Sequence, residues 1–352
     1  MSDAPSGWTY TMPKRSNPVR MKEIQPTTIR LEAMSACQLR CPTCPTTTGE
    51  ARPVVGSGYL KVADFKSLLE KNPWVRHVEL SNFGEILLSP DFLAILEAAQ
   101  LAGVAVSADN GLNLNTASER QLEGMVRYGL RSATISLDGA SQETYSQYRI
   151  RGNFDTVIAN VEAINRFKRE YGSRAPELTW QFVVFGHNEH ELPAAKAMAE
   201  RLGMRWSPKL NWDSTHAPVR DLELVRRYAG AASREEYEAR FGKAYRRGMC
   251  TQLWNAPQIN WDGKVLGCCV NHWGEFGGNA FRDGLREALN SEGMRYAREM
   301  LRGRSPAKEG IPCTTCAVYE GMKAREDWLG EKEVRAKGTS VLRRLRRKFT
   351  AG

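Results

Sequence analysis

The stretch Cys37-Gln38-Leu39-Arg40-Cys41-Pro42-Thr43-Cys44 places three cysteines within eight residues. It follows Thr28 to Glu32, a pattern that predicts a β-strand, so the cysteines lie in the loop leaving this strand. Structural zinc sites and electron-transfer clusters usually take four protein ligands. Three local cysteines without an obvious fourth predict a [4Fe–4S] cluster with one open iron, and a zinc knuckle is the alternative.

The residues after these cysteines alternate between helix and strand patterns. Helices are expected at residues 64–71, 91–101, 118–128, 154–171 and 191–202. Strands are expected at residues 28–32, 75–81, 103–108, 132–137, 177–185 and 205–210. Six strands at about 30 residues per βαβ unit fill residues 26–212 but cannot close an eight-stranded barrel. The sequence therefore predicts an α/β fold, an open partial (βα)6 TIM-like barrel with its chemistry at the carboxyl ends of the strands.

The spacing of Cys37, Cys41 and Cys44, C-x3-C-x2-C, resembles the signature of the radical S-adenosylmethionine (radical SAM) superfamily. The resemblance implies that the open iron is chelated by the amino and carboxyl groups of SAM. One electron from the cluster then cleaves SAM to methionine and a 5′-deoxyadenosyl radical, which removes a hydrogen atom from the substrate. Thr43 stands where the family often has an aromatic residue.

Further motifs follow the later strands in the order that this family has. Asn82-Phe83-Gly84-Glu85 resembles the Gly-Gly-Glu motif that binds the methionine amine, which implies contacts from Gly84 and from the backbone near Glu85. Residues 107–111, with Asn110, resemble the Thr-Asn-Gly turn after the third strand, and Ser136 and Asp138 end the fourth. These positions are the expected SAM-binding residues.

The segment from Thr144 to Arg149, with Gly152 and Phe154 beyond it, resembles a segment of radical SAM proteins that carry additional clusters. Arg149 is expected to pair with the SAM carboxylate, because a guanidinium fork suits a carboxylate. Arg151 is the rival for this role. A surface salt bridge is the alternative for either arginine.

Four more cysteines form a second group. Cys250, Gly263 and Cys268 follow C-x12-G-x4-C, and Cys313 and Cys316 form a C-x-x-C pair. The arrangement resembles the twitch domain, a shortened relative of the SPASM domain, and implies one auxiliary [4Fe–4S] cluster with four protein ligands. A zinc ribbon with four cysteine ligands is the alternative. Residues 259–267 predict a hairpin with an Asp-Gly turn, which would bring Cys268 beside the barrel mouth.

Candidate catalytic residues lie near both groups of cysteines. Cys269 has no partner cysteine, and a thiol there would donate a hydrogen atom or shuttle a proton; a small buried hydrophobic side chain is the alternative. His187 and Glu189, after the fifth strand, and Asp213, after the sixth, are candidate bases or hydroxyl ligands. Ordinary loop residues are the alternative for these three.

Composition sets the class of protein and the expected organisation. The 352 residues are 41% hydrophobic, with no apolar run long enough to span a membrane and no signal-like N-terminus, which predicts a cytoplasmic protein. Because the cytoplasm keeps thiols reduced, clustered cysteines in such a protein are expected to bind metals. The expected organisation is an N-terminal extension (1–25), a barrel (26–212), a helical linker (213–245), a small α+β auxiliary-cluster domain (246–325) and a basic tail (326–352).

The formal charge of +10 arises mostly in the tail, so no specific nucleic-acid binding is expected of the body. An amphipathic segment there would contact an anionic membrane or an acidic partner weakly, or form a solvated terminus. Its apolar face comprises Val341, Leu342, Leu345 and Phe349.

Together these features predict a radical SAM oxidoreductase or epimerase with two [4Fe–4S] clusters and S-adenosyl-L-methionine. Its expected substrate is a sugar, polyol or aminocyclitol, oxidised or epimerised at a carbinol centre, with the auxiliary cluster as electron acceptor and a flavodoxin or ferredoxin as donor. Only 36 residues precede Cys37, too few for the leader-binding domain of peptide-modifying relatives. A peptide or protein maturase and a zinc-binding nucleic-acid module remain the alternatives.

Overall fold

The computed structural model describes residues 23–335, and the predicted amphipathic segment of the tail lies outside them. One sheet has eight strands in the order β6-β5-β4-β3-β2-β1-β7-β8. The strands are β1 (Thr28–Leu31), β2 (His77–Glu79), β3 (Ala105–Leu112), β4 (Ser132–Ser136), β5 (Glu177–Val184), β6 (Arg205–Leu210), β7 (Gln258–Ile259) and β8 (Val265–Gly267).

Helices connect the strands of the barrel and build most of the C-terminal region. The first eight are α1 (Pro45–Thr48), α2 (Arg52–Val55), α3 (Val62–Lys71), α4 (Phe92–Leu101), α5 (Glu119–Arg127), α6 (Gln142–Tyr148), α7 (Phe154–Glu170) and α8 (Leu192–Arg201). The others are α9 (Leu222–Ala229), α10 (Arg234–Phe241), α11 (Gln252–Asn255), α12 (Leu285–Leu289), α13 (Glu292–Met300), α14 (Ala317–Ala324) and α15 (Glu331–Arg335). Four 3₁₀ turns are η1 (Ile86–Leu88), η2 (Glu189–Glu191), η3 (Arg247–Thr251) and η4 (Pro312–Thr315).

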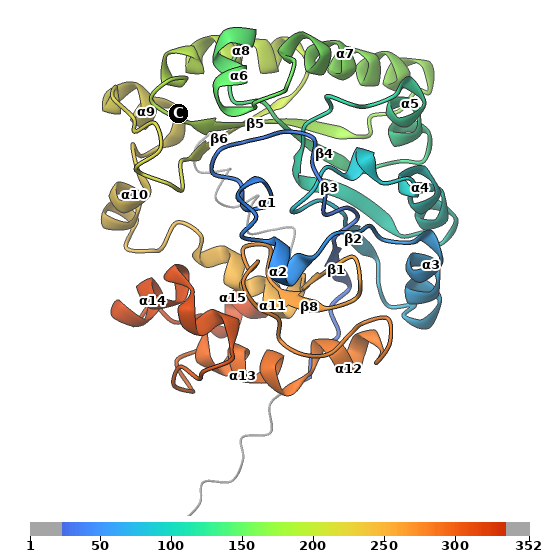
Figure 1. Ribbon diagram of the computed structural model, residues 1–352, viewed down its shortest axis with the longest axis vertical. Coiled ribbons are helices and arrows are strands. Elements are labelled where there is room, and N and C mark those ends of the chain that lie inside the picture. Colours follow the sequence, from blue (N-terminus) through green and yellow to red (C-terminus); the bar gives the residue numbers. More distant parts are fainter. Residues whose placement is uncertain (1–22, 336–352) are drawn as a thin grey trace, which may run out of the picture.

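Strands β1 to β6 are parallel and pair in chain order, with helices on the outer face of the curved sheet (Figure 1). Their carboxyl ends therefore meet at one rim, which we call the mouth. The sheet is open, because β6 and β8 are its two edges. The predicted partial (βα)6 barrel is confirmed. In the described part of the chain no helix has the length and apolarity needed to cross a membrane.

Local sequence signals fix where the longer helices begin. Ser118 and Gln121 form a reciprocal capping box at the start of α5, and the Asn153 side chain accepts the backbone N–H of Thr156 at the start of α7. Such caps satisfy amide groups that have no partner inside the helix. Both helices then bury one apolar face against the sheet.

The hairpin formed by β7 and β8 extends the barrel sheet. β7 pairs in parallel with β1, matching Arg30 with Gln258 and Leu31 with Ile259, and β8 returns antiparallel to β7. The backbone N–H of Glu32 donates to the Ile259 carbonyl oxygen at 2.9 Å. The predicted hairpin is present, but it shares its sheet with the barrel because it covers the otherwise unpaired edge of β1.

The third strand differs from its prediction. It runs from Ala105 to Leu112, and its register against β4 shifts between Ala108 and Leu112. Asn110 therefore lies within a bulged strand, so the turn expected at residues 107–111 was wrong. Gly111 adopts a φ of 139°, a backbone conformation that favours glycine and allows the irregular pairing.

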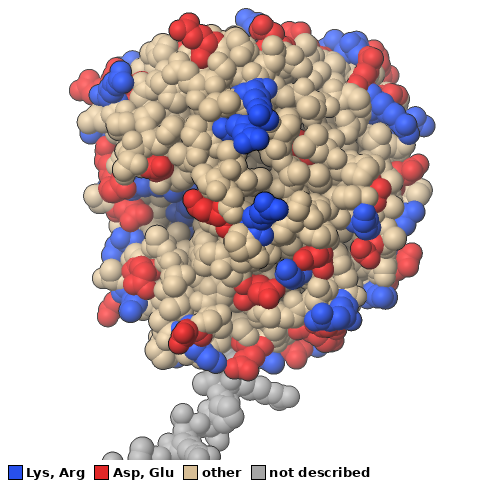
Figure 2. Space-filling view, viewed as in Figure 1, with Lys and Arg blue, Asp and Glu red and all other residues tan. Residues whose placement is uncertain are grey.

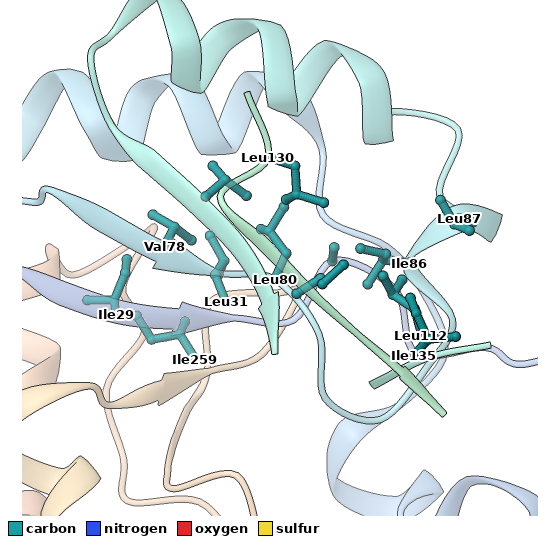
Figure 3. Packing of buried hydrophobic residues seen from close by; sticks show 14 of the residues in the cluster. Ile29, Leu31, Val78, Leu80, Ile86, Leu87, Leu112, Leu130, Ile135 and Ile259 are labelled. Atoms are coloured by element: carbon teal, nitrogen blue, oxygen red, sulfur yellow. The ribbon is translucent and has the colours of Figure 1, made fainter. Parts of the chain in front are cut away.

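The core is continuous between the barrel and the C-terminal region. Ile29 and Leu31 of β1 lie among Val78, Leu80 and, from the hairpin, Ile259 (Figure 3). All five are fully buried, and burying one such side chain contributes about 1.5–3 kcal/mol. The C-terminal region is therefore part of the same folded body as the barrel.

Candidate active site

The three N-terminal cysteines occupy the loop between β1 and α1, at the mouth. Cys41 is buried, Cys37 and Cys44 are half-buried, and all three pack against one apolar cluster that includes Leu39 and Phe185. Burial raises the pKa of Cys37 to about 12, and the other two thiols add to this effect. The free thiol of Cys37 therefore keeps its proton at neutral pH, and a bound metal would displace it.

The loop fits an iron–sulfur cluster. Each cysteine of a [4Fe–4S] cluster binds a separate iron, so its ligands surround a group larger than one ion. Among residues 23–335, no three His, Cys, Asp or Glu side chains are arranged to hold a single metal ion. The charges of Cys41 and Cys44 contribute to the raised pKa of Cys37, and the three side chains pack in one apolar cluster. Three thiolates on one loop suit three corners of a cluster.

The segment after β2 lies against the cysteine loop. The Glu85 backbone N–H donates to the Ala36 carbonyl oxygen at 2.8 Å. A Cβ atom at Gly84 would stand 2.1 Å from the Met34 carbonyl oxygen and 2.7 Å from that of Ala36. Only glycine permits this approach of two backbones. The predicted SAM-binding segment is thus held beside the cysteines.

Four buried carboxylates hold the loops of the mouth in place. Burial raises the pKa of Glu32 to about 8 and that of Glu85 to about 7. The Glu85 side chain is therefore committed to the scaffold, and only its backbone remains available for the predicted contact with SAM. The carboxylates accept backbone N–H groups as follows: Glu32 from Phe83 and Gly84, Glu79 from Ser81 and Asp109, Glu85 from Leu87 and Asn113, and Asp138 from Val183.

Arg149 lies between Asp138 and the cysteine loop. Its Nε donates to Asp138 Oδ2 at 2.6 Å, and its Nη1 lies 3.6 Å from Cys41 Sγ. Asp138 is fully buried and fixes the guanidinium beside the cysteines. No described residue is hydrogen-bonded to Nη2, which leaves donors for a carboxylate. Arg151 is exposed and has a φ of 73°, away from the ion pair that holds Arg149.

Aromatic side chains from other segments surround Thr43. Its hydroxyl is hydrogen-bonded to Tyr148 Oη at 2.9 Å, and its carbonyl oxygen accepts the Trp212 indole N–H at 3.4 Å. The rings of Tyr148 and Phe185 lie 4.5 Å apart between centroids. The position before the third cysteine is therefore beside aromatic rings, although Thr43 carries none itself.

Two other predicted SAM residues connect strands at the mouth. The Asn110 side chain donates to Asn82 Oδ1 at 2.5 Å, and its backbone N–H donates to Ser81 Oγ at 2.9 Å. Ser136 Oγ accepts from the Gln181 side chain at 3.5 Å. Both residues lie at the expected edge of the sheet.

The three predicted bases differ in what they already bind. The Asp213 carboxylate accepts the backbone N–H groups of Thr215 and His216, and Glu189 accepts those of Arg220 and Asp221. His187 stacks on Phe185 at 5.2 Å, and its Nε2 is buried without a hydrogen-bond partner among residues 23–335. Burial, followed by the neighbouring His216, lowers the pKa of His187.

The four C-terminal cysteines come from separate segments: Cys250 from η3, Cys268 from the end of β8, Cys313 from η4 and Cys316 from the start of α14. Burial raises the pKa of Cys250, and the three other thiols raise it further. Four thiols that influence one pKa are near one another, as the ligands of one cluster would be.

Cys269 lies beside this group and is held by Gln252. The Gln252 side chain donates to Cys269 Sγ at 3.4 Å and accepts the Cys269 backbone N–H at 2.8 Å. The thiol is half-buried and influences the pKa of Cys268. It is oriented by a polar partner at the edge of the cysteine group.

The segment that follows Cys269 reaches the mouth. His272 Nε2 lies 3.7 Å from Glu50 Oε2, and its ring meets Phe83 edge-on at 6.4 Å. Leu266 packs against Ala51 and Val55, just beyond the first cysteine group. The two cysteine groups are thus connected through packed side chains.

Several residues of the mouth were missed by sequence reasoning. Glu32 directly follows β1 and Glu79 ends β2, and a buried acidic residue at the end of an apolar strand was a usable signal. Tyr148 directly precedes Arg149 in the motif already quoted. Trp212 carried no local signal, because its contact with Thr43 joins residues 169 positions apart.

Comparison with known proteins agrees with this geometry. Residues 250–317 match the SPASM family, described as an iron–sulfur cluster-binding domain, and the match begins at Cys250 and includes the other three cysteines. An AdoMet-dependent heme synthase of Methanosarcina barkeri is 26% identical over 144 residues. This match spans 40% of the chain and 40% of the length of that curated relative.

Solved structures share the fold. Streptococcus suis SuiB bound to S-adenosylmethionine matches with a TM-score of 0.60 and 14% identity over 84% of this chain and 71% of SuiB. SuiB bound to its precursor peptide SuiA matches with a TM-score of 0.58 and 12% identity, over 84% and 70%.

The matches support the cofactors predicted from the sequence, SAM and two [4Fe–4S] clusters. The individual ligand and SAM-binding residues remain predictions. The cysteine motif, the open parallel sheet and the iron–sulfur domain match together support a radical SAM protein with a C-terminal SPASM domain.

Proposed function

We propose that this chain generates a 5′-deoxyadenosyl radical from SAM and uses it to oxidise a carbinol carbon of a sugar, polyol or aminocyclitol. The observation that supports this proposal most is the position of two cysteine groups on one sheet. The first group leaves β1 at the mouth. Cys268 follows β8, two strands away and antiparallel to β1. The segment after Cys269 returns to the mouth, where His272 Nε2 lies 3.7 Å from Glu50 Oε2. A substrate at the mouth would then lie between a radical source and an electron acceptor.

When bound, a [4Fe–4S] cluster on Cys37, Cys41 and Cys44 with SAM on its open iron supplies the radical, and a second cluster on the four C-terminal cysteines supplies the electron acceptor. Arg149, fixed by Asp138, binds the SAM carboxylate. Thr43, Asn110, Ser136 and the backbone of Gly84 and Glu85 line the remaining SAM site.

The substrate reaction needs a base. A carbinol becomes a ketone when its carbon loses a hydrogen atom and its oxygen loses a proton, with one electron leaving the molecule. His187 is the residue we assign as base, because its lowered pKa keeps the imidazole neutral and able to accept a proton. Asp213 and Glu189 order the adjoining loops and orient the substrate hydroxyls.

Cys269 decides between two outcomes. If its thiol returns a hydrogen atom to the opposite face of the substrate radical, the product is an epimer and no electron leaves the substrate. The sulfur radical left on Cys269 then takes up one electron from the reductant and a proton from solvent, which restores the thiol. Cys269→Ala would then abolish epimerisation while leaving 5′-deoxyadenosine formation intact. An oxidation would proceed without the thiol.

The test is a coupled assay on the anaerobically reconstituted chain, with SAM, a reductant or reduced flavodoxin, and a panel of sugars, polyols and aminocyclitols. A true substrate gives ketone and 5′-deoxyadenosine in equal amounts, and deuterium on its carbinol carbon appears in the 5′-deoxyadenosine. Uncoupled SAM cleavage with every member of the panel contradicts the proposed substrate class.

A peptide maturase is the second candidate function. It is favoured by the shared fold with SuiB, which has been solved with a precursor peptide. In that case a peptide encoded beside this chain, and no small molecule, would take up a new bond or lose hydrogen in the same assay. Mass spectrometry of the peptide separates the two candidates.

A further inference from the structure

The two faces of β5 carry different kinds of side chain. Trp180 and Phe182 lie in the large apolar cluster, where the Trp180 ring meets Phe154 of α7 at 6.4 Å between centroids. Successive side chains of a strand point to opposite faces of its sheet. Gln181 and Val183 therefore point away from α7, toward the inside of the open barrel, which we call the inner face.

Val183 connects the inner face with the cysteine loop. It is buried in the apolar cluster to which Cys41 belongs and against which Cys37 and Cys44 pack. Gln181 lies two residues earlier on the same strand and face. Since a strand rises about 3.3 Å per residue, Gln181 lies roughly 7 Å deeper in the barrel than this contact. It is therefore beneath the cysteine loop.

The neighbours of Gln181 on the inner face are small and polar. Its register partners are Ser136 on β4 and Ser207 on β6, and all three residues are buried. Beyond Ser136, β3 contributes Gly111, where an added Cβ atom would stand 2.7 Å from Ser136 Oγ. Bulky branched side chains usually fill the interior of a barrel. This row therefore departs from ordinary barrel packing.

The Gln181 carboxamide is not satisfied by these neighbours. Its Nε2 donates to Ser136 Oγ at 3.5 Å, the limit of a hydrogen bond, and its Oε1 is buried without a hydrogen-bond partner among residues 23–335. The residue is only 6% exposed. An unpaired polar atom at such a depth destabilises the folded chain unless a bound molecule supplies the missing partner.

The inner face reaches solvent near this row. Asp109 is exposed, although it lies in β3, an interior strand of the sheet. Lys209, the register partner of Val183 on β6, is partly exposed. The space-filling view is hollowed on the left flank of the molecule, beside α10, on the side where β6 forms the open edge of the sheet (Figure 2). A small molecule therefore has access to the inner face.

We propose that Gln181 selects a hydroxylated substrate, because its carboxamide hydrogen-bonds one hydroxyl group of a polyol bound on the inner face beneath the cysteine loop. In either orientation of the carboxamide, one of its two polar atoms is left for the substrate. A hydroxyl group suits both orientations, since it donates and accepts. This inference rests on the proposed function and deepens it, because it names a residue that recognises the substrate class.

The strongest competing explanation is that Gln181 binds SAM. Ser136, its hydrogen-bond partner, is one of the residues assigned to SAM, and the ribose of SAM also carries hydroxyl groups. The two explanations differ in which ligand loses affinity when the carboxamide is removed. The affinity for SAM is therefore measured beside the affinity for a polyol.

The experiment measures binding of glucose, myo-inositol and streptamine to the anaerobically reconstituted full chain by calorimetry, with saturating SAM and without a reductant. Gln181→Met keeps the length of the side chain and removes its polar atoms. It is expected to weaken binding of the tightest of the three compounds about tenfold, the effect of one lost buried hydrogen bond, and to leave SAM affinity unchanged. Thr179→Val is the matched control, because Thr179 is similarly buried, two residues deeper on the same strand and face, and it should bind like the parent.

The melting temperature separates this role from a structural one. Because Gln181→Met replaces an unpaired polar group with an apolar one, the melting temperature without polyol is expected to stay the same or rise. Gln181→Asn keeps a carboxamide but withdraws it by one methylene group, and it is expected to weaken polyol binding as well. The monodeoxy derivative that lacks the bound hydroxyl group should bind the parent and Gln181→Met equally, which identifies that hydroxyl group.

Equal polyol affinity in the parent and both Gln181 variants overturns the inference. So does weaker SAM binding without weaker polyol binding, and so does a parent chain that binds none of the three compounds. Failure of the proposed function is recognised separately, because polyol binding would then depend on Gln181 while no polyol stimulated 5′-deoxyadenosine formation in the coupled assay.

Discussion

The two cysteine groups are assembled in different ways. Cys37, Cys41 and Cys44 lie in one loop, and their spacing is set by seven consecutive peptide bonds and by the backbone contact at Gly84. The C-terminal group draws on η3, β8, η4 and α14, and Cys250 and Cys316 are brought together only by packing of the C-terminal region. The first group is therefore held together by one loop, and the second by the packing of segments that are distant in the sequence.

This difference predicts different consequences of losing each group. Replacing the loop cysteines removes the assigned ligands of the SAM-binding cluster and leaves the hydrophobic core of the protein intact. Replacing a C-terminal cysteine removes a crosslink among distant segments, because a bound cluster stabilises whatever folded arrangement it requires. The predictions below test this distinction.

The largest effect is expected from replacing Cys37, Cys41 and Cys44 together with alanine. Iron should fall from about eight to about four per chain, and 5′-deoxyadenosine formation should disappear. The melting temperature should change little, because these thiols lie in a mouth loop. Metal analysis, product assay and calorimetry measure the three quantities; retained SAM cleavage would exclude the assigned cluster.

Cys316→Ala is expected to lower iron to about four per chain while 5′-deoxyadenosine formation continues. Product should be lost, because the electron acceptor is missing. The melting temperature should fall by more than in the triple variant. Cys269→Ala is the matched control and should keep all the iron, since Cys269 is bound by Gln252 and is outside the assigned ligand set.

Arg149→Gln is expected to weaken SAM binding about tenfold, the usual cost of losing a charge-assisted contact to a carboxylate. It also leaves Asp138 buried without its cation. Arg151→Gln, on an exposed residue two positions away, should bind SAM like the parent chain. Equal weakening in both variants would mean that general positive charge, and not the position of Arg149, attracts SAM.

Gly84→Ala places a methyl group against two carbonyl oxygens that belong to the backbone and cannot move aside. We expect the free energy of unfolding to fall by about 1–3 kcal/mol, together with poorer iron incorporation. Gly330→Ala is the matched control, because this glycine, like Gly84, lies outside the positive-φ region and an added Cβ there meets nothing nearer than 3.5 Å. Denaturant unfolding compares the two variants.

The smallest effect concerns the pH dependence of stability. The pKa of Glu32 is about 8 in the folded chain, above its usual value of 4.5, so its contribution to stability is complete at low pH and is lost as the pH rises through 8. The melting temperature of Glu32→Gln should therefore fall less between pH 5 and pH 9 than that of the parent. An exposed control, Glu70→Gln, should follow the parent, and parallel curves for all three would refute the assignment.

The barrel could be predicted from the sequence because helix and strand periodicity are local patterns. The cysteine loop could be predicted because its three cysteines are close together in the sequence. It did not foresee that β7 would join β1, since strand pairing between residues 228 positions apart leaves no local pattern. The contact between Trp212 and Thr43 was equally hidden. A partner, or the lack of one, is decided by tertiary packing.

The pairing of β1 with β7 has a consequence for biosynthesis. Strand β1 leaves the ribosome before β7, because its partner residues in β7 lie 228 positions later in the chain. At about 5–20 residues per second, one edge of β1 stays uncovered for roughly ten seconds or more after that strand emerges. An uncovered parallel strand is a template for pairing with other chains. Expression yield should therefore respond to translation speed and to chaperones that shield nascent strands.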